Sequence, residues 1–274
     1  YNVQSIIEKY MVAYNQEKPS KNTAIVVMNP KNGEILGMAS YPQFDLNNPR
    51  NLANVYSEEQ LASMSDTDVT NALYQLWTNY CVSESYEPGS TFKILSTYAP
   101  AIDTMGYTLS TTIVDEPFSY SNGRPVENWN HTYKGTVTVK QAIAQSMNVC
   151  AVKTLTAITP QLGYDYLLNF GISTLVDNRV EKDGSVSSDI HQALALGGIT
   201  DGVTNLEMTA AYASIANTGK YIRPVFYSQV IDSNGRVLLD NTAPKAKTIL
   251  KDSTAYLLTQ AMISVVKEGT GTPC

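Results

Sequence analysis

The chain is short of charged residues for its length. Charged side chains make up 16% of its 274 residues, against roughly 25% in an ordinary soluble domain. Lys and Arg number 19 against 25 Asp and Glu, a net charge of -6. No basic cluster occurs, which argues against a nucleic-acid-binding surface. We therefore expect no nucleic-acid partner.

Cysteine and histidine are also scarce. Cys81, Cys150 and Cys274 show neither metal-ligand spacing nor a disulfide framework, and we expect Cys81 and Cys150 to be small buried apolar residues. His131 and His191 are too few for a three-histidine zinc site, and neither lies in a metalloprotease motif. Both are expected to be structural. The sequence predicts no metal and no cofactor.

No apolar run approaches 18 residues, so no membrane span is expected within this sequence. The chain begins at Tyr1 without an initiator methionine or a signal peptide. We expect an excised piece whose anchor or targeting segment lies upstream. Membrane contact is predicted only through that anchor.

Apolar residues form 43% of the chain, enough for a substantial core. Residues 2–15 follow helical periodicity. Residues 24–28 and 35–40 are apolar runs separated by turn formers that include Asn32-Gly33, which predicts a β-hairpin. A helix followed by two buried strands favours a sheet with helices packed against it.

The remaining elements are predicted from periodicity, capping boxes and breakers. Ser57 with Gln60, Thr138 with Gln141, and Thr204 with Glu207 are the expected boxes, and Gly219 is expected to close the third helix. Further helices are expected at 90–102 (kinked or ended by Pro100), 139–146, 149–156, 161–170 and 257–266, strands at 221–231 and 236–239, and loops at 110–135 and 173–190. We predict an α+β fold, one domain over 1–274 with a helical lobe at about 90–218.

Ser90 and Lys93 stand three residues apart at an expected helix start, directly after Pro88-Gly89. Residues at this spacing share a helix face. A lysine kept out of water has a lowered pKa, and its neutral amine can take the proton of a hydroxyl. Such a pair activates a serine without a histidine. Alone, the spacing is more typical of an N-cap followed by a solvated lysine.

A second polar group, Ser146 and Asn148, falls at or just past an expected helix end. A hydroxyl there can relay a proton to a leaving amine, and the Asn148 amide can bond a substrate amide or the Lys93 amine. On spacing alone, the pair is more typical of a plain helix terminus.

Taken together, Ser90-x-x-Lys93 and Ser146-x-Asn148 resemble the motifs of penicillin-binding proteins and serine β-lactamases. Longer stretches narrow the resemblance to penicillin-binding transpeptidase domains, at 28–40, 86–93, 196–208 and 269–272. The last two are most similar to the bifunctional class A branch, whose members carry a glycosyltransferase upstream. The resemblance covers nearly the whole chain.

The resemblance implies a β-lactamase/transpeptidase-like fold, with a central antiparallel sheet flanked by helices and a helical lobe. It implies acyl transfer, in which Lys93 deprotonates Ser90 and Ser90 attacks the carbonyl between two D-alanines of a peptidoglycan stem peptide. Ser146 passes a proton to the departing D-alanine. The implied partners are D-Ala-D-Ala stem peptides and β-lactam antibiotics. The implied location is the extracytoplasmic face of the bacterial cell membrane.

Tyr86, Asn128 and Trp129 are candidates to line the substrate cleft, although an aromatic residue in a loop serves as often as a packing lid. Glu87 could tune Lys93 or simply be a solvated loop acid.

One departure from the family pattern is plain, because no Lys-Thr-Gly or Lys-Ser-Gly occurs in the sequence. In the family this third motif lies on a central strand and supplies an oxyanion-hole amide and groups for the substrate carboxylate. We expect the C-terminal strands to be missing from this chain. The other oxyanion amide is expected to be the N–H of Ser90.

Three alternatives stay open. A serine β-lactamase is disfavoured, because no Glu-x-x-Leu-Asn segment is present. A sensor module acylated by β-lactams without catalysis is the second. The third is an incomplete fragment without activity.

Overall fold

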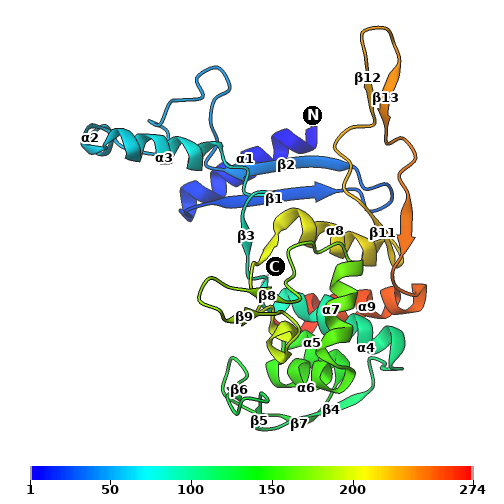
Figure 1. The fold of residues 1–274 in the computed structure, drawn as a ribbon. Helices are drawn as coiled ribbons and strands as arrows, with labels where there is room; N and C mark the ends of the chain where they lie inside the picture. The colour runs from blue at the N-terminus through cyan, green and yellow to red at the C-terminus, as the bar shows by residue number, and fades with distance from the viewer. Residues whose placement is uncertain (1, 273–274) are drawn as a thin grey trace. The chain divides into compact units, whose positions relative to one another are not determined.

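The computed structural model describes residues 2–272 (Figure 1). Cys274 therefore lies outside the described residues. The chain divides into two compact units, the first comprising 2–28, 35–85 and 204–206, and the second comprising 29–34, 86–203 and 207–272. The single domain over 1–274 stays a prediction.

The first unit is built on an antiparallel hairpin, β1 (Thr23–Met28) and β2 (Ile35–Tyr41). The amphipathic helix α1 (Asn2–Glu17) packs on this hairpin through Ile7 and Met11, which bury Ala39. The predicted helix and hairpin are thus confirmed. Among the described residues every sheet has two strands, so this hairpin is what the structure shows of the expected central sheet.

Two short helices complete the first unit, α2 (Glu58–Ser63) and α3 (Asp66–Trp77). The predicted Ser57–Gln60 capping box opens α2, and a second box, which the sequence reading missed, opens α3 from Ser65. Their apolar sides form a small separate core.

The second unit is mainly helical, and the helical lobe at about 90–218 stays a prediction. Its helices are η1 (Gly89–Thr91), η2 (Ile94–Tyr98), α4 (Ala99–Thr104), α5 (Val139–Ala144), α6 (Asn148–Ile158), α7 (Pro160–Asn169), η3 (Gln192–Leu196), α8 (Asn205–Ala216, whose first two residues belong to the first unit) and α9 (Asp252–Glu268). Phe92, Leu95 and Tyr98 are completely buried at the centre of its core. The segment that carries Ser90 and Lys93 is thereby anchored in the hydrophobic core of the second unit.

The helix predicted after Ser90 is present but is not a continuous α-helix. It begins as the 3-10 turn η1, widens into the π-turn η2 and becomes α-helical only from Ala99. Pro100 does not end the helix, because α4 continues to Thr104, and the predicted kink stays a prediction. Pro100 lies in the first turn of α4, where its missing N–H is tolerated.

The strands of the chain are short. They are β3 (Ser85–Tyr86), β4 (Thr112–Asp115), β5 (Phe118–Ser119), β6 (Pro125–Val126), β7 (Gly135–Thr138), β8 (Arg179–Val180), β9 (Val186–Ser187), β10 (Val203–Thr204), β11 (Lys220–Ile222), β12 (Gln229–Ile231), β13 (Val237–Asp240) and β14 (Ala246–Thr248).

Three strand and loop predictions need correction. The region 110–135 contains β4, whose partner β7 begins at Gly135, and the pair β5–β6. The region 173–190 contains β8–β9, so neither region is wholly loop. Strands of two to four residues are too short to show a period of two. The single strand predicted at 221–231 is broken after Ile222, because Pro224 cannot donate to a ladder. The hairpin β12–β13 is confirmed.

Helix ends are mostly where the sequence places them. The Thr138–Gln141 box opens α5, which ends at Ala144, two residues before the predicted 146. The prediction of Gly219 as the C′ residue of α8 is off by one position. Thr218 takes the left-handed C′ conformation with a φ of +55° and bonds its N–H to the Ile215 carbonyl, and Gly219 follows with a φ of +81° and an N–H bond to the Ser214 carbonyl. The Thr204–Glu207 box stays a prediction. Within residues 2–272, no helix is both long and apolar enough to cross a bilayer.

Candidate active site

Lys93, the lysine of the Ser-x-x-Lys motif, is buried, with 3% of its surface exposed. Its Nζ donates three hydrogen bonds, to the Ser146 carbonyl (2.7 Å), the Ser146 hydroxyl (3.0 Å) and Asn148 Oδ1 (2.7 Å). Burial lowers the pKa of this amine to about 7, with a small opposing contribution from Cys150. Near neutral pH the amine is therefore divided between a charged and a neutral form.

Ser146 lies in the turn between α5 and α6 with a φ of +51°, in the left-handed region. Its N–H bonds to the Ile143 carbonyl, and the next N–H, of Met147, bonds to the Ala142 carbonyl. This is the helix ending that normally employs glycine. The turn brings both the carbonyl and the hydroxyl of Ser146 to Lys93.

Asn148 is the first residue of α6, and its side chain is oriented by hydrogen bonds on both sides. Its Nδ2 donates to the Glu127 carbonyl over 2.8 Å, so Oδ1 faces Lys93. Its backbone N–H donates to Asn128 Oδ1 over 2.9 Å. A loop twenty residues earlier therefore fixes the position of this amide.

Asn128 is buried, and protein groups occupy its amide on every side. Its Nδ2 donates to Asp115 Oδ1 (2.9 Å) and to the Thr132 carbonyl (3.0 Å). Its Oδ1 accepts from the N–H groups of Asn148 and Val149 at the start of α6. In this structure Asn128 positions α6, and its predicted contact with substrate stays a prediction.

Ser90 is exposed at the start of the same helical segment and lines a cavity of about 320 Å³ together with Lys93 and Ser146. Within residues 2–272, no hydrogen bond joins the Ser90 hydroxyl to Lys93, whose three donors are directed elsewhere. The Ser90 N–H lies in the first turn of η1, where helical N–H groups lack intrahelical acceptors. The complete lining is Ser90, Thr91, Lys93, Ile94, Tyr98, Ile143, Ser146, Tyr212, Met262, Val265, Val266 and Thr270.

Two contacts hold the turn that carries Ser90. The Tyr212 hydroxyl, on α8, donates to the Thr91 carbonyl over 2.6 Å. Gly197, with a φ of +76°, lies against Gly89, and a side-chain carbon added at Gly197 would stand 2.5 Å from the Gly89 carbonyl oxygen. The close approach requires glycine at position 197.

The segment after α9 forms another wall of the cavity. Thr270 donates its N–H to the Ala144 carbonyl over 3.0 Å, and Gly269 touches the same carbonyl. Thr270 thereby lies beside Ser146. Sequence reasoning missed Tyr98, Tyr212 and Thr270 as lining residues, and only the family resemblance of 269–272 signalled the last.

The two aromatic candidates do not line this cavity. Tyr86 is 47% exposed, and partial burial raises its pKa. Trp129 is 71% exposed in the loop after Asn128. Their predicted contacts with substrate stay predictions. His131 forms an exposed pair with Glu127, Nδ1 to Oε2, at 3.0 Å.

Two cysteines lie among residues 2–272. Cys81 and Cys150 are buried free thiols, as predicted, and burial raises the pKa of Cys150 to about 12. Among residues 2–272, no group of three or more His, Cys, Asp or Glu side chains is placed to hold a metal ion.

Comparison with known proteins shows one family. The family described as "Penicillin binding protein transpeptidase domain" matches residues 23–273. Penicillin-binding protein 1A/1B of Bacillus subtilis is 33% identical over 195 residues, which cover 70% of this chain and 20% of that protein. Penicillin-binding protein 1A of Streptococcus pneumoniae is 30% identical over 263 residues, 86% of this chain and 35% of that protein. The chain thus spans well under half the length of these relatives.

Solved structures show the same fold. The D,D-transpeptidase domain of a peptidoglycan glycosyltransferase from Eggerthella lenta superimposes with a TM-score of 0.70 at 24% identity, over 96% of this chain and 66% of that one. Penicillin-binding protein 3 of Mycobacterium tuberculosis, in complex with aztreonam, gives 0.76 at 22% identity, over 99% and 59%. The predicted α+β, β-lactamase/transpeptidase-like fold is confirmed. The chain therefore belongs to the penicillin-binding protein transpeptidase domain family.

Proposed function

We propose that this domain works as a D,D-transpeptidase, a serine acyltransferase that cross-links peptidoglycan stem peptides ending in D-Ala-D-Ala. The observation that carries the proposal is the state of Lys93. A buried amine with a pKa near 7 is bonded to Ser146 and Asn148 and shares a cavity with Ser90. An amine near neutrality can both accept and return a proton at physiological pH.

Acylation begins when neutral Lys93 takes the proton of the Ser90 hydroxyl. The Ser90 oxygen attacks the carbonyl carbon between the two D-alanines and forms a C–O bond. The N–H of Ser90, exposed in the first turn of η1, faces the developing oxyanion. The C–N bond then breaks, and Lys93 returns the proton through the Ser146 hydroxyl, 3.0 Å away, to the departing D-alanine amine.

Transfer reverses these proton movements. The amine of a neighbouring stem attacks the ester carbonyl, loses a proton to the Ser146–Lys93 pair, and displaces Ser90. Ser90 regains its proton, and an amide cross-link remains. A β-lactam ring opened by Ser90 leaves the same ester but no departing amine, so it blocks the site.

The hydrogen bonds of Lys93 are compatible with this sequence of steps. All three donors of Lys93 are occupied, which is the arrangement of the charged amine. Loss of one proton frees a lone pair on Nζ and releases one of the three bonds. Catalytic hydrogen bonds commonly tighten only when substrate is bound.

Stem peptides and β-lactams are accordingly the proposed partners, and the proposed place of action is the extracytoplasmic face of the bacterial membrane. The whole domain, 1–274, is proposed as the unit that carries the site. The steps above require neither metal nor cofactor.

A covalent label tests the proposal. The chain, its Ser90→Ala variant and a matched Ser233→Ala control in the exposed β12–β13 turn are incubated with a fluorescent penicillin. We expect stable labelling of the parent and of the control and none of Ser90→Ala. Labelling that survives Ser90→Ala contradicts the assignment of the nucleophile. Steady hydrolysis of the penicillin would instead favour a β-lactamase.

A further inference from the structure

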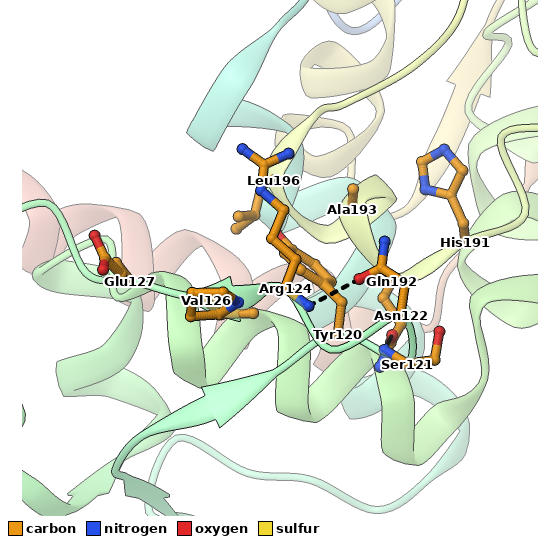
Figure 2. A pocket seen from close by; sticks show the side chains of 11 residues that line it. Tyr120, Ser121, Asn122, Arg124, Val126, Glu127, His191, Gln192, Ala193 and Leu196 are labelled. Carbon is orange, nitrogen blue, oxygen red and sulfur yellow. Dashed lines mark hydrogen bonds between the residues drawn. The ribbon is translucent and has the colours of Figure 1, made fainter.

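A second cavity of the helical unit has a volume of about 740 Å³, against about 320 Å³ for the Ser90 cavity. One wall is the β5–β6 hairpin and the residues that follow it, 120–127, and the other is the η3 segment, 191–196. Figure 2 shows Arg124, Glu127 and His191 around this space. Its volume lies in the range of small-molecule and peptide sites.

The two walls are braced against each other by protein hydrogen bonds. The Ser121 N–H donates to Gln192 Oε1 over 2.7 Å, the dashed contact in Figure 2. Gln192 Nε2 in turn donates to the Thr156 hydroxyl on α6 over 2.8 Å. Both ends of the Gln192 amide are thus used to hold the walls. The cavity is consequently formed before any ligand arrives.

Each wall also leads to the candidate active site. The carbonyl of Glu127 accepts the Asn148 Nδ2 bond that turns Oδ1 toward Lys93. Leu196, on the opposite wall, directly precedes Gly197, which lies against Gly89 beside Ser90. The cavity is therefore bounded by residues that also position Lys93 and the turn before Ser90.

The charges of the lining leave one cation without a partner. Within residues 2–272, the guanidinium of Arg124 makes no ion pair and no hydrogen bond, whereas Arg179 is held by Glu181 and Asp201. The acid of the lining, Glu127, already pairs with His131 at 3.0 Å. The remaining lining includes the partly exposed side chain of Leu196 and the edge of the buried Val126. The complementary ligand is an anionic group carried on an aliphatic stem.

We propose that this cavity binds a part of the stem peptide that carries a free carboxylate. Arg124 receives the carboxylate through its two parallel N–H donors, and the aliphatic stem lies on Leu196. The inference rests on the proposed function and refines it, since it assigns the domain to stem peptides with a free acidic side chain over amidated ones.

Equilibrium binding tests the subsite without turnover. Two N-acetylated pentapeptides ending in D-Ala-D-Ala are compared, identical except for glutamate or glutamine at the second position. Their dissociation constants are measured with the Ser90→Ala chain. We expect the glutamate peptide to bind about fivefold more tightly, the upper value for an exposed ion pair. Adding Arg124→Gln should abolish the preference, and Arg124→Glu should reverse it.

Arg236→Gln is the matched control, because it removes the same charge from the β12–β13 turn and should leave the preference intact. Equal binding of the two peptides to the Ser90→Ala chain, or a preference that survives Arg124→Gln, overturns the inference. Fluorescent penicillin labelling of the parent chain and of the Arg124 variants, all with Ser90 intact, tests the proposed function separately. Loss of labelling in the parent chain would reject acylation, while the binding comparison would still decide the role of Arg124.

Discussion

Asn128 caps α6 at the residue whose side chain holds Lys93. The Asn148 N–H donates to Asn128 Oδ1 over 2.9 Å, and Asn148 Oδ1 accepts from Lys93 over 2.7 Å. Asn128 is itself held by the buried carboxylate of Asp115. A single hydrogen-bonded series therefore joins a loop and β4 to the candidate base. The orientation of the amine depends on an asparagine that bonds neither Lys93 nor Ser90.

Asn128→Ala should lower both stability and acylation. Losing the cap costs about 1 kcal/mol. Asp115 Oδ1 loses its donor while Oδ2 keeps the Lys134 N–H, and this buried unpaired oxygen adds about 1–3 kcal/mol. We expect penicillin labelling of the folded variant to slow about tenfold, because Asn148 loses its fixed position. Urea unfolding and labelling rates measure the two effects. Ser57→Ala, which removes the α2 cap, is the control and should affect stability alone. A wild-type labelling rate in Asn128→Ala would refute the positioning role of Asn128.

Local features of the fold could be predicted from sequence, because their causes are local. The Thr138–Gln141 box places the start of α5 within one residue, since both partners lie in one turn. The two-residue pair β5–β6 in 110–135 could not be predicted from periodicity, because two residues are too few to show a period of two, although Asn122-Gly123 between the strands is a turn signal. The π-turn η2 had no signal in residues 94–98 that distinguishes it from an α-helix.

The candidate site likewise has features that could be predicted from sequence and features that could not. The spacing of Ser90 and Lys93 is local, and the role of Ser146 and Asn148 followed from the motif resemblance. That Asn128 caps α6 depends on a bond across twenty residues, for which periodicity gives no indication. Tyr212 and Thr270 reach the cavity only through the packing of α8 and α9.

Substitutions at Ser146 should separate strain from chemistry. Ser146→Ala and Ser146→Gly both remove the hydroxyl, so both should slow acylation about 100-fold or more if it relays the proton. Only glycine relieves the left-handed φ of +51°. We therefore expect Ser146→Gly to be about 1 kcal/mol more stable than Ser146→Ala. Denaturant unfolding gives the comparison, and a glycine variant that is the less stable of the two would contradict it.

Acylation should depend on pH through Lys93. Its pKa is lowered to about 7 by burial, so the neutral, proton-accepting fraction increases as pH rises through that value. The labelling rate should climb about tenfold per pH unit below roughly pH 6 and level off above about pH 8. Stopped-time labelling across this range measures it. Lys93→Arg, which stays protonated, should abolish the rise, and a flat wild-type profile would exclude Lys93 as the base.

Stability should also respond to the titration of Lys93. Its folded pKa of about 7 lies below the unfolded value of about 10.4. Between these values the unfolded chain binds more protons, so the free energy of unfolding should rise with pH, by up to about 1.4 kcal/mol per unit. Urea unfolding at about pH 7, 8 and 9 measures the slope. Lys93→Met should lose this contribution and the exposed control Lys140→Met should keep it; equal slopes in the parent and Lys93→Met would contradict the burial cost.

A paired glycine experiment should isolate the contact that supports Ser90. Gly197 and Gly235 have similar left-handed φ angles, +76° and +79°, so alanine at either costs about 1 kcal/mol of backbone strain. At Gly235 the added methyl meets nothing within 4 Å, whereas at Gly197 it meets the backbone of Gly89. Gly197→Ala should therefore lose more stability than Gly235→Ala.

Of the two variants, only Gly197→Ala should also be labelled more slowly by penicillin, by about tenfold, because the turn before Ser90 must move to accept the methyl group. Labelling rates are compared under conditions in which unfolding measurements show both variants to be folded. A Gly197→Ala chain that labels as fast as Gly235→Ala would mean that the Gly197–Gly89 contact stabilises the fold without positioning the serine. The difference between the two variants thus assigns the contact to the site or to the scaffold, independently of the strain they share.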